Sequence, residues 1–476
     1  MMPRRVVVAG YGMAGARLAE EIRRRDPAGE RVALTVVGAE RHAAYNRVLL
    51  SAVLGGSLRP ESVLLQDEGW ADEHRVDLRA GTAVTGVDRS ARTVTLSDGS
   101  TVDYDVLVLA TGSRPWLPPV EGLVTEEGLA PGAVAFRTLD DCTRIVDAAR
   151  PGAPVAVLGG GLLGLEAARG LAHRGNLVTV VHPVGHLMER QLDPAAGRVL
   201  AAKLATLGIE TRLGVTAARY LPGDGLKLAD GTYVAADLVV VSAGVRPASD
   251  LAEAAGLATD GGVLVNDALC TSDPRVHAIG DCARHPGTVS GLVQPAWEQA
   301  AVLADLLTGA NPAARYRGTP VVTRLKARDV DLAALGEVHT EVDSADAEVL
   351  CLQDATRGRY AKLVLREDRV TGAIVLGVPD AAAAITQLFD RGTPAPADRL
   401  ALLLGHAATA PPASPVDLPA SATVCRCNTV TKRQLVSAWR AGARSPADLA
   451  TATRATTGCG GCRDAVRTIA DWLATT

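Results

Sequence analysis

With 476 residues the chain is too long for one hydrophobic core, and its length predicts about three domains. The formal net charge of -4 gives no electrostatic reason to expect nucleic acid or an anionic membrane as a partner. No uninterrupted apolar run reaches the length of a membrane span, and the short N-terminal run leads directly into a glycine-rich turn. We therefore expect a cytoplasmic protein without a membrane segment.

The first 40 residues predict a nucleotide-binding unit. A buried strand at 6–9 is followed by the GxGxxG run 10–15 and then by an amphipathic helix. In this context the first glycine permits a tight turn, the second lets backbone amides approach a pyrophosphate, and the third lets helix and strand pack closely. A second strand at 34–37 leads to Glu40, the candidate for the ribose hydroxyls. The fingerprint residues are Gly10, Gly12, Met13, Ala14 and Gly15.

A second fingerprint of the same kind begins at residue 159. A strand at 154–158 precedes it, and the strand at 178–181 ends at His182, where an NADH site would normally offer a carboxylate. With His186 and Arg190 nearby, the sequence leaves NADH and NADPH both open. Two ligand-free Rossmann folds are disfavoured, because such glycines are costly without a phosphate to hold. The fingerprint residues are Gly159, Gly161, Leu162, Leu163 and Gly164.

Four cysteines near the C-terminus predict a metal site. Thiolates in fours select zinc or iron–sulfur clusters. The first pair is CxC rather than the CxxC knuckle of zinc ribbons, and helix signals lie between the pairs: a Thr431–Gln434 capping box, a stop at Gly442, and Ser445-Pro446 as the next start. This pattern favours an iron–sulfur cluster and leaves zinc open. The predicted ligands are Cys425, Cys427, Cys459 and Cys462. The other four cysteines (Cys142, Cys270, Cys282 and Cys351) are scattered and predicted to fill cores.

Three further segments, 110–115, 237–247 and 271–283, complete a family pattern with the two fingerprints. Together they resemble the two-dinucleotide-domain flavoprotein reductases, the class of ferredoxin, rubredoxin and glutathione reductases. The resemblance implies an α/β fold with two Rossmann-like domains, FAD in the first site and NADH or NADPH in the second. It further implies FAD contacts by Arg47, Val84, Thr111, Gly112, Asp281 and Ala296, and nicotinamide-nucleotide contacts by Glu166, His182 and Gly244. Glu166 is also a weak candidate for a catalytic role. The redox-active disulfide of the glutathione reductase branch is missing here.

Segments 323–332 and 360–365, together with the cysteine-rich tail, narrow the match. They resemble the N-terminal half of the NAD(P)H-dependent assimilatory nitrite reductase large subunit, and the tail resembles the bacterioferritin-associated ferredoxin type of [2Fe-2S] domain. The nitrite reductases continue into a sirohaem region, whereas this sequence stops at Thr476, so its length resembles the electron-transfer subunits of assimilatory nitrate reductase.

The expected organisation is an FAD domain formed by 1–117 and 245–312, an NAD(P) domain at 118–244, a small α+β domain at 313–405, a linker at 406–421 and a helical [2Fe-2S] domain at 422–476. The expected function is electron transfer from NAD(P)H through FAD and the cluster to a protein acceptor, either a molybdenum nitrate reductase or a sirohaem nitrite reductase. Two alternatives remain open. One is a flavin dehydrogenase of an opine or amino acid, and the other is a redox- or iron-sensing binding module.

Overall fold

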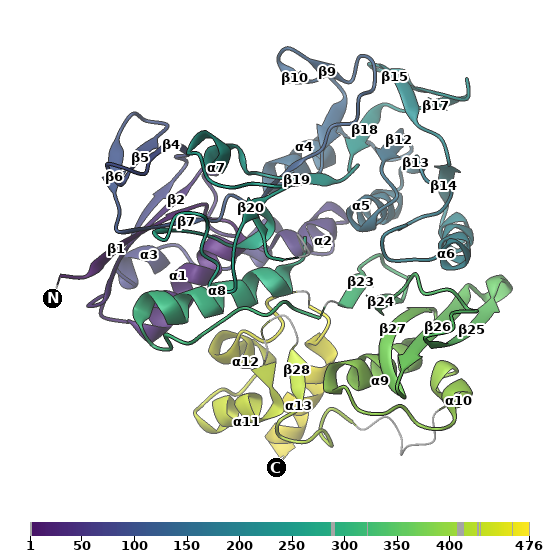
Figure 1. Cartoon of the computed structure of the whole chain (residues 1–476). Helices are drawn as coiled ribbons and strands as arrows, with labels where there is room; N and C mark the ends of the chain where they lie inside the picture. The colour runs from purple at the N-terminus through teal and green to yellow at the C-terminus, as the bar shows by residue number, and fades with distance from the viewer. Residues whose placement is uncertain are drawn as a thin grey trace.

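The computed structural model describes residues 2–286, 291–320, 322–406, 414–425, 428, 430–458 and 460–475. Two five-stranded parallel sheets, one five-stranded antiparallel sheet and a small helical unit are the main parts of the described chain, and Figure 1 shows the parallel sheets in its upper half. The predicted α/β class with two Rossmann-like domains is confirmed. The exact domain boundaries stay a prediction. Within the described residues, none of the helices combines the length and the apolar character needed to cross a membrane.

The first parallel sheet holds the first fingerprint. Its strand order is β21-β7-β1-β2-β3, and the runs of β1 and β7 are almost entirely buried, because helices cover the faces of a parallel sheet. Helix α1 (Met13–Arg25) follows β1 and packs against α8 (Val293–Thr308). The strands are β21 (Val276–Ala278), β7 (Val106–Leu109), β1 (Arg4–Ala9), β2 (Val32–Gly38) and β3 (Val76–Ala80). A three-stranded meander of β4 (Val84–Asp88), β5 (Thr93–Leu96) and β6 (Thr101–Asp103) adjoins them.

The second parallel sheet repeats this plan around the second fingerprint. Its order is β11-β18-β12-β13-β14, with α5 (Leu162–His173) following β12 as α1 follows β1. The strands are β11 (Ala133–Ala135), β18 (Leu238–Val241), β12 (Pro154–Leu158), β13 (Leu177–His182) and β14 (Ile209–Leu213). Helices α4 (Leu139–Ala148) and α6 (Pro194–Thr206) belong to this domain. The two chain crossings between the domains, β8 (Ser113–Pro115) and β19 (Val245–Pro247), pair with each other in antiparallel fashion.

The antiparallel sheet belongs to the small domain, drawn in green at the lower right of Figure 1. Its order is β23-β24-β27-β26-β25, and α9 (Pro379–Arg391) packs on one face through Ala381 and Ile385. The other face joins the apolar core of the nicotinamide domain through Tyr360 and Ile374. The strands are β23 (Val322–Leu325), β24 (Leu332–Gly336), β27 (Arg369–Leu376), β26 (Arg359–Arg366) and β25 (Glu348–Asp354).

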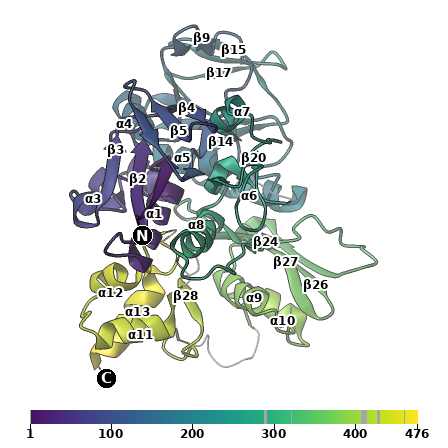
Figure 2. The same cartoon turned by 60° about the vertical axis from the view of Figure 1, so that its left-hand side comes forward.

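The C-terminal unit lies against the FAD domain, below α1 and α8 in both Figure 1 and Figure 2. It consists of β28 (Thr423–Cys425), β29 (Val430–Thr431), α11 (Lys432–Arg440), α12 (Pro446–Thr453) and α13 (Arg463–Thr475). The predicted capping box is confirmed, since Thr431 accepts from the Gln434 amide while the Gln434 side chain accepts from the Thr431 amide. Ser445 caps α12 with Pro446 at its first position, also as predicted.

Two sequence-based expectations need comment. Cys142 and Cys282 are buried as expected, but Cys351 is exposed on the edge strand β25, so its assignment as core filler was wrong. Most of the predicted linker, residues 407–413, lies outside the described residues, and so do the candidate ligands Cys427 and Cys459.

Candidate functional site

The first fingerprint leaves an open cradle at the start of α1. A Cβ atom on Gly10 would lie 2.1 Å from the carbonyl oxygen of Ala110, and one on Gly15 would lie 1.9 Å from that of Gly10, so both glycines are required by backbone packing. A Cβ atom on Gly12 would meet nothing closer than the Arg47 Nε, at 4.0 Å. Gly12 is also the N-cap of α1 and supplies no side-chain cap, so Met13 and Ala14 begin a helix whose first amides are available to an anion. This geometry fits a pyrophosphate.

Glu40 and Arg47 meet beside this cradle. The Arg47 guanidinium forms an ion pair with the Glu40 carboxylate, and the Tyr45 hydroxyl donates to the second Glu40 oxygen at 2.6 Å. The Arg47 guanidinium also lies 4.9 Å from the centre of the Tyr45 ring. Burial raises the pKa of Tyr45, so this hydroxyl keeps its proton and remains a donor. Val84 begins β4, and its predicted backbone contact with adenine stays a prediction.

A second polar group surrounds Asp281, which lies in the segment between β21 and α8. Its Oδ2 accepts from the Ser113 hydroxyl at 2.9 Å and from the Arg137 Nη2 at 2.8 Å. Thr111 is held by donating to the Ala248 carbonyl at 2.7 Å, and the space a Cβ atom on Gly112 would take is open. Ala296 lies in the first turn of α8 and is buried. Sequence reasoning missed Arg137, because it belongs to no nucleotide-binding motif and reaches Asp281 across 144 residues of chain.

The second fingerprint has the same construction as the first. A Cβ atom on Gly159 would lie 2.1 Å from the Ser242 carbonyl oxygen, and one on Gly164 would lie 2.0 Å from that of Gly159. A Cβ atom on Gly161 would meet nothing within 4 Å, and this N-cap of α5 again supplies no side-chain cap. Leu162 and Leu163 start the helix, and Gly244, at the matching strand exit, also faces open space. These residues fit a second dinucleotide.

His182 is buried at the end of β13 and is fixed at both ring nitrogens. Its Nδ1 lies 3.1 Å from the Gly160 amide, which donates to it, and its Nε2 lies 3.0 Å from the Glu189 carboxylate. The Glu189 carboxylate therefore lies near the second fingerprint, with the His182 ring between it and the Gly160 amide. Sequence reasoning missed Glu189, because it lies seven residues beyond the strand end where the motif places its acid.

Glu166 is a buried carboxyl group where three parts of the chain meet. Its Oε2 accepts from the Ser51 hydroxyl at 2.8 Å, and its Oε1 accepts from the Lys326 backbone amide at 3.0 Å. Burial raises the pKa of Glu166, and the Lys326 charge offsets part of that effect. Glu166 thus contacts the FAD domain through Ser51 and the small domain through Lys326. Its role at the flavin–nicotinamide junction stays a prediction.

Two of the four candidate cluster ligands are described, and both are buried. Cys425 ends β28, and Cys462 directly precedes α13, whose N-terminal dipole favours a thiolate. The Asn428 Nδ2 donates to the Cys425 Sγ at 3.8 Å. Both cysteines belong to an apolar cluster that includes Trp297 of α8. This donor set fits a thiolate-ligated cluster.

Family models match three consecutive parts of the chain. Residues 4–300 match the pyridine nucleotide-disulphide oxidoreductase model. The chain belongs to this family. Residues 321–393 match the rubredoxin NAD+ reductase C-terminal domain, and residues 423–472 match the BFD-like [2Fe-2S] binding domain.

Relatives with long matches come from nitrogen metabolism. The chain is 33% identical over 99% of its length to the assimilatory nitrate reductase electron transfer subunit of Bacillus subtilis and covers 60% of that protein. It is 34% identical over 96% of its length to the nitrite reductase (NADH) large subunit of Escherichia coli and covers 54% of it. The chain thus spans little more than half of these relatives. Among solved structures, the covalent putidaredoxin reductase–putidaredoxin complex superposes with a TM-score of 0.75 and 27% identity, covering 85% of this chain and 99% of that one.

The family matches and the fold agree on the cofactors. The protein is an FAD-dependent NAD(P)H oxidoreductase with a [2Fe-2S] domain, as the sequence predicted. The match to a [2Fe-2S] model favours a cluster over the zinc alternative for the four cysteines. The roles of individual cofactor-binding residues stay predictions.

Proposed function

We propose that this protein oxidises NADH and delivers the electrons singly to an assimilatory nitrate or nitrite reductase. The observation that carries the proposal is the packing of the [2Fe-2S] domain on α1 and α8, the two helices whose N-termini face the proposed FAD site. When bound, the nicotinamide supplies a hydride, FAD takes up its two electrons, and the cluster passes them on one at a time. The chain itself binds, orients and shields these groups.

The second fingerprint supports a nicotinamide nucleotide as the donor. The N-terminus of α5 at Gly161 is open and has no side-chain cap, and a flavin dehydrogenase that takes its electrons from an opine or amino acid does not need a second nucleotide site. Glu189 favours NADH in particular, because a carboxylate held against His182 at the end of β13 would repel the extra phosphate of NADPH.

The electron acceptor is proposed from the relatives. The Bacillus subtilis and Escherichia coli proteins named above are a nitrate reductase subunit and a nitrite reductase subunit. We propose a separate molybdenum nitrate reductase as the acceptor, with a sirohaem nitrite reductase as the second candidate.

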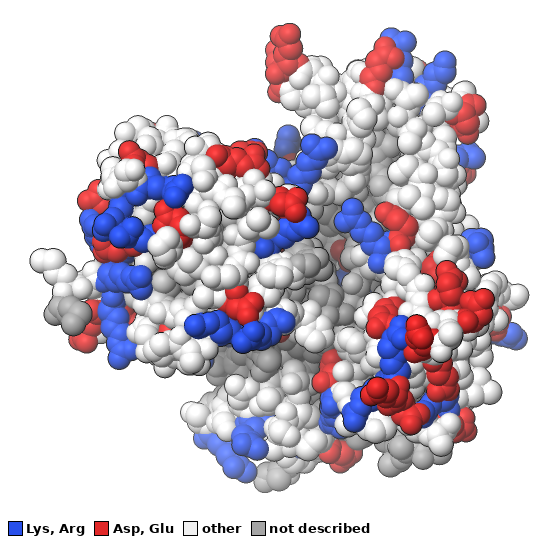
Figure 3. All heavy atoms as spheres, viewed as in Figure 1, with Lys and Arg blue, Asp and Glu red and all other residues white. Residues whose placement is uncertain are grey.

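A cytoplasmic location stays a prediction of the sequence. Acidic and basic side chains are interspersed on the face seen in Figure 3, so this face has no continuous basic surface that would bind nucleic acid.

The test is an anaerobic titration of the cofactor-loaded protein with NADH and, separately, NADPH. Visible absorption follows the flavin, and low-temperature EPR follows the cluster. We expect NADH to bleach the flavin and to produce an S = 1/2 cluster signal, and the reduced protein to support nitrate reduction when a nitrate reductase catalytic subunit is added. Flavin bleaching without any cluster signal in iron-loaded protein would refute the electron path. A cluster reduced far more slowly than the flavin, beside tight binding of a partner, would favour the sensing module.

A further inference from the structure

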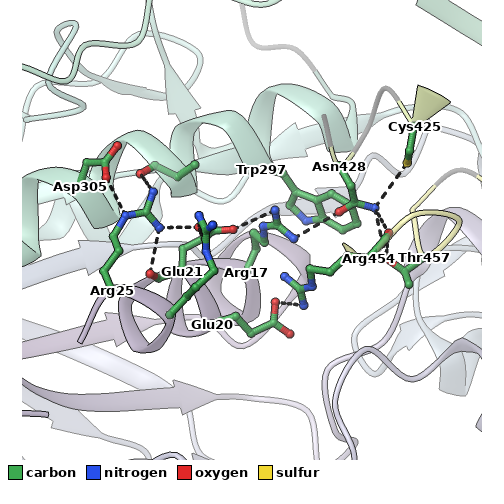
Figure 4. Close-up of polar contacts among 12 residues, drawn as sticks. Arg17, Glu20, Glu21, Arg25, Trp297, Asp305, Cys425, Asn428, Arg454 and Thr457 are labelled. Atoms are coloured by element: carbon green, nitrogen blue, oxygen red, sulfur yellow. Dashed lines mark hydrogen bonds and ion pairs between the residues drawn. The ribbon is translucent and has the colours of Figure 1, made fainter. Parts of the chain in front are cut away.

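The [2Fe-2S] domain is held on the FAD domain by a polar network that begins at the Cys425 sulfur. The Asn428 side chain lies between the two domains: its Nδ2 donates to the Cys425 Sγ at 3.8 Å, and its Oδ1 accepts from the Arg17 Nη1 at 3.2 Å. Figure 4 shows the Asn428 amide placed between the Arg17 guanidinium and the sulfur. The same amide nitrogen donates to the Arg454 carbonyl at 2.6 Å, which fixes its orientation. Asn428 therefore contacts a ligand sulfur and the FAD domain at the same time.

Arg17 is held in position by the helix that it belongs to. Its Nη2 lies 2.9 Å from the Glu21 carboxylate one turn further along α1, and its side chain is 11% exposed. Glu21 also pairs with Arg25, whose Nε reaches the Asp305 carboxylate of α8 at 2.6 Å. As Figure 4 shows, a line of alternating charges runs along α1 and ends at Asn428. A guanidinium that is so constrained loses little side-chain entropy when it binds the second domain.

Asn46 makes a second contact between the domains, with the loop that precedes the second cysteine pair. This fully buried side chain donates through Nδ2 to the carbonyls of Thr457 at 2.5 Å and Gly458 at 2.7 Å, directly before the second cysteine pair. Asn46 precedes Arg47, the candidate ligand of the FAD pyrophosphate. A salt bridge between Glu20 of α1 and Arg454 completes the polar contact. Both cysteine-bearing loops are thus anchored to segments that also line the FAD site.

Trp297 supplies the apolar part of the contact. Its ring belongs to the same buried cluster as Cys425 and Cys462, and its Nε1 donates to the Met13 carbonyl at 3.1 Å. The Arg17 guanidinium lies 5.3 Å from the centre of this ring. Trp297 is next in sequence to Ala296, the residue expected at the flavin. Trp297 thus lies between the first turn of α8 and the buried cysteines of the [2Fe-2S] domain.

We propose that Arg17, Asn46 and Trp297 form the docking surface for the [2Fe-2S] domain in its electron-accepting position, and that Asn428 is a positioning residue that couples docking to the Cys425 sulfur. The inference deepens the proposed function and rests on it. An N–H donor to a ligand sulfur stabilises the negative charge added on reduction, so Asn428 raises the reduction potential of the cluster, and Arg17 strengthens this effect by holding the Asn428 amide in the docked position. Docking and ease of reduction are thereby linked.

The experiment uses the full-length, cofactor-loaded protein and the variants Arg17→Ala, Asn428→Ala and their combination. The matched control is Arg467→Ala, which removes the same charge from an exposed pair with Asp464 on α13, in the same domain as Asn428. Rapid mixing with NADH measures flavin bleaching and cluster reduction separately, and EPR-monitored titration gives the potential of the cluster. Iron content is measured for every variant.

We expect Arg17→Ala to slow cluster reduction roughly tenfold, in proportion to the lost docked fraction, without changing flavin bleaching. Asn428→Ala lowers the potential of the cluster; a tenfold loss in the equilibrium constant corresponds to about 59 mV for one electron. The effects of the two substitutions do not add in the double variant, because the two side chains act through one contact. Its rate of cluster reduction and its cluster potential stay close to those of the single variants. The control behaves as wild type.

The outcomes separate this inference from the proposed function. If NADH bleaches the flavin of the wild type but never reduces its cluster, the proposed function fails. If the wild type reduces its cluster and both interface variants match Arg467→Ala in rate and potential, the docking inference is overturned. Should Asn428→Ala lose iron, Arg17→Ala decides alone, because Arg17 lies on α1 of the FAD domain and is not one of the candidate cluster ligands.

Discussion

Gly10 and Gly12 lie two residues apart, but backbone packing requires glycine at position 10, whereas the space beside Gly12 is open. Alanine substitutions at the two positions therefore test the first site. In Gly10→Ala the new Cβ atom would lie 2.1 Å from the Ala110 carbonyl oxygen at a φ of +126°. Left-handed strain of about 1–2 kcal/mol and overpacking of about 1–3 kcal/mol predict a loss of roughly 2–5 kcal/mol of folding stability. This variant fails because it damages the backbone.

Gly12→Ala has no such conflict. Gly12 has a φ of -80°, and its Cβ atom would meet nothing closer than 4.0 Å. The apoprotein therefore loses only about 0.5–1 kcal/mol, the cost of alanine at an N-cap. With FAD the methyl group occupies the space of the pyrophosphate. Losing one charge-assisted hydrogen bond of about 1.5–3 kcal/mol weakens FAD binding roughly 10- to 150-fold.

The assay compares thermal unfolding of both apoproteins with FAD affinity measured by flavin fluorescence quenching. We expect Gly12→Ala apoprotein to melt within about 3 °C of wild type and to bind FAD poorly. Gly10→Ala apoprotein melts well below both. Wild-type FAD affinity in Gly12→Ala, or equal destabilisation of the two apoproteins, would refute the assignment of the cradle to the pyrophosphate.

Four further outcomes follow from other parts of the structure. Gly161→Ala faces open space in the same way, so it weakens NADH binding roughly tenfold or more while FAD content, read by absorbance, stays at wild-type level. Glu189→Gln raises the KM for NADH about tenfold in steady-state dye reduction and reduces the difference in KM between NADH and NADPH. An unchanged ratio of the two KM values would contradict the proposed role of Glu189. Burial raises the pKa of Glu166, so as pH rises its carboxyl ionises in the unfolded chain before it ionises in the folded one. Wild type then loses stability relative to Glu166→Gln as pH rises through neutrality, so the melting temperature of the variant increases relative to that of wild type; a difference that does not change with pH would rule out a raised pKa. Thr431→Ala removes the α11 cap and costs about 1 kcal/mol, which faster amide hydrogen exchange in that helix would report.

The features that arise within one strand, turn and helix could be predicted from residue spacing alone. In both fingerprints the strand, the glycines and the helix lie within about 20 residues. Their order, strand then turn then helix, predicts a parallel Rossmann-like arrangement. The helix caps at Thr431 and Ser445 are equally local, because a cap is a contact between residues three apart. The cysteine pairs and their helical spacing indicated the cluster domain for the same reason.

The contacts between side chains of different domains could be identified only in the folded chain. Arg137 reaches Asp281, and Asn46 reaches Thr457 across 411 residues, and no periodic pattern encodes such distances along the chain. Cys351 was misassigned because an apolar strand residue is buried only if a neighbouring layer covers it, and β25 lies at a sheet edge. Glu189 was missed for a similar reason: the fold, and not the motif, brings its carboxylate to His182 at the end of β13. Local chemistry follows from sequence spacing, whereas the docking of one domain on another depends on surfaces that exist only after each has folded.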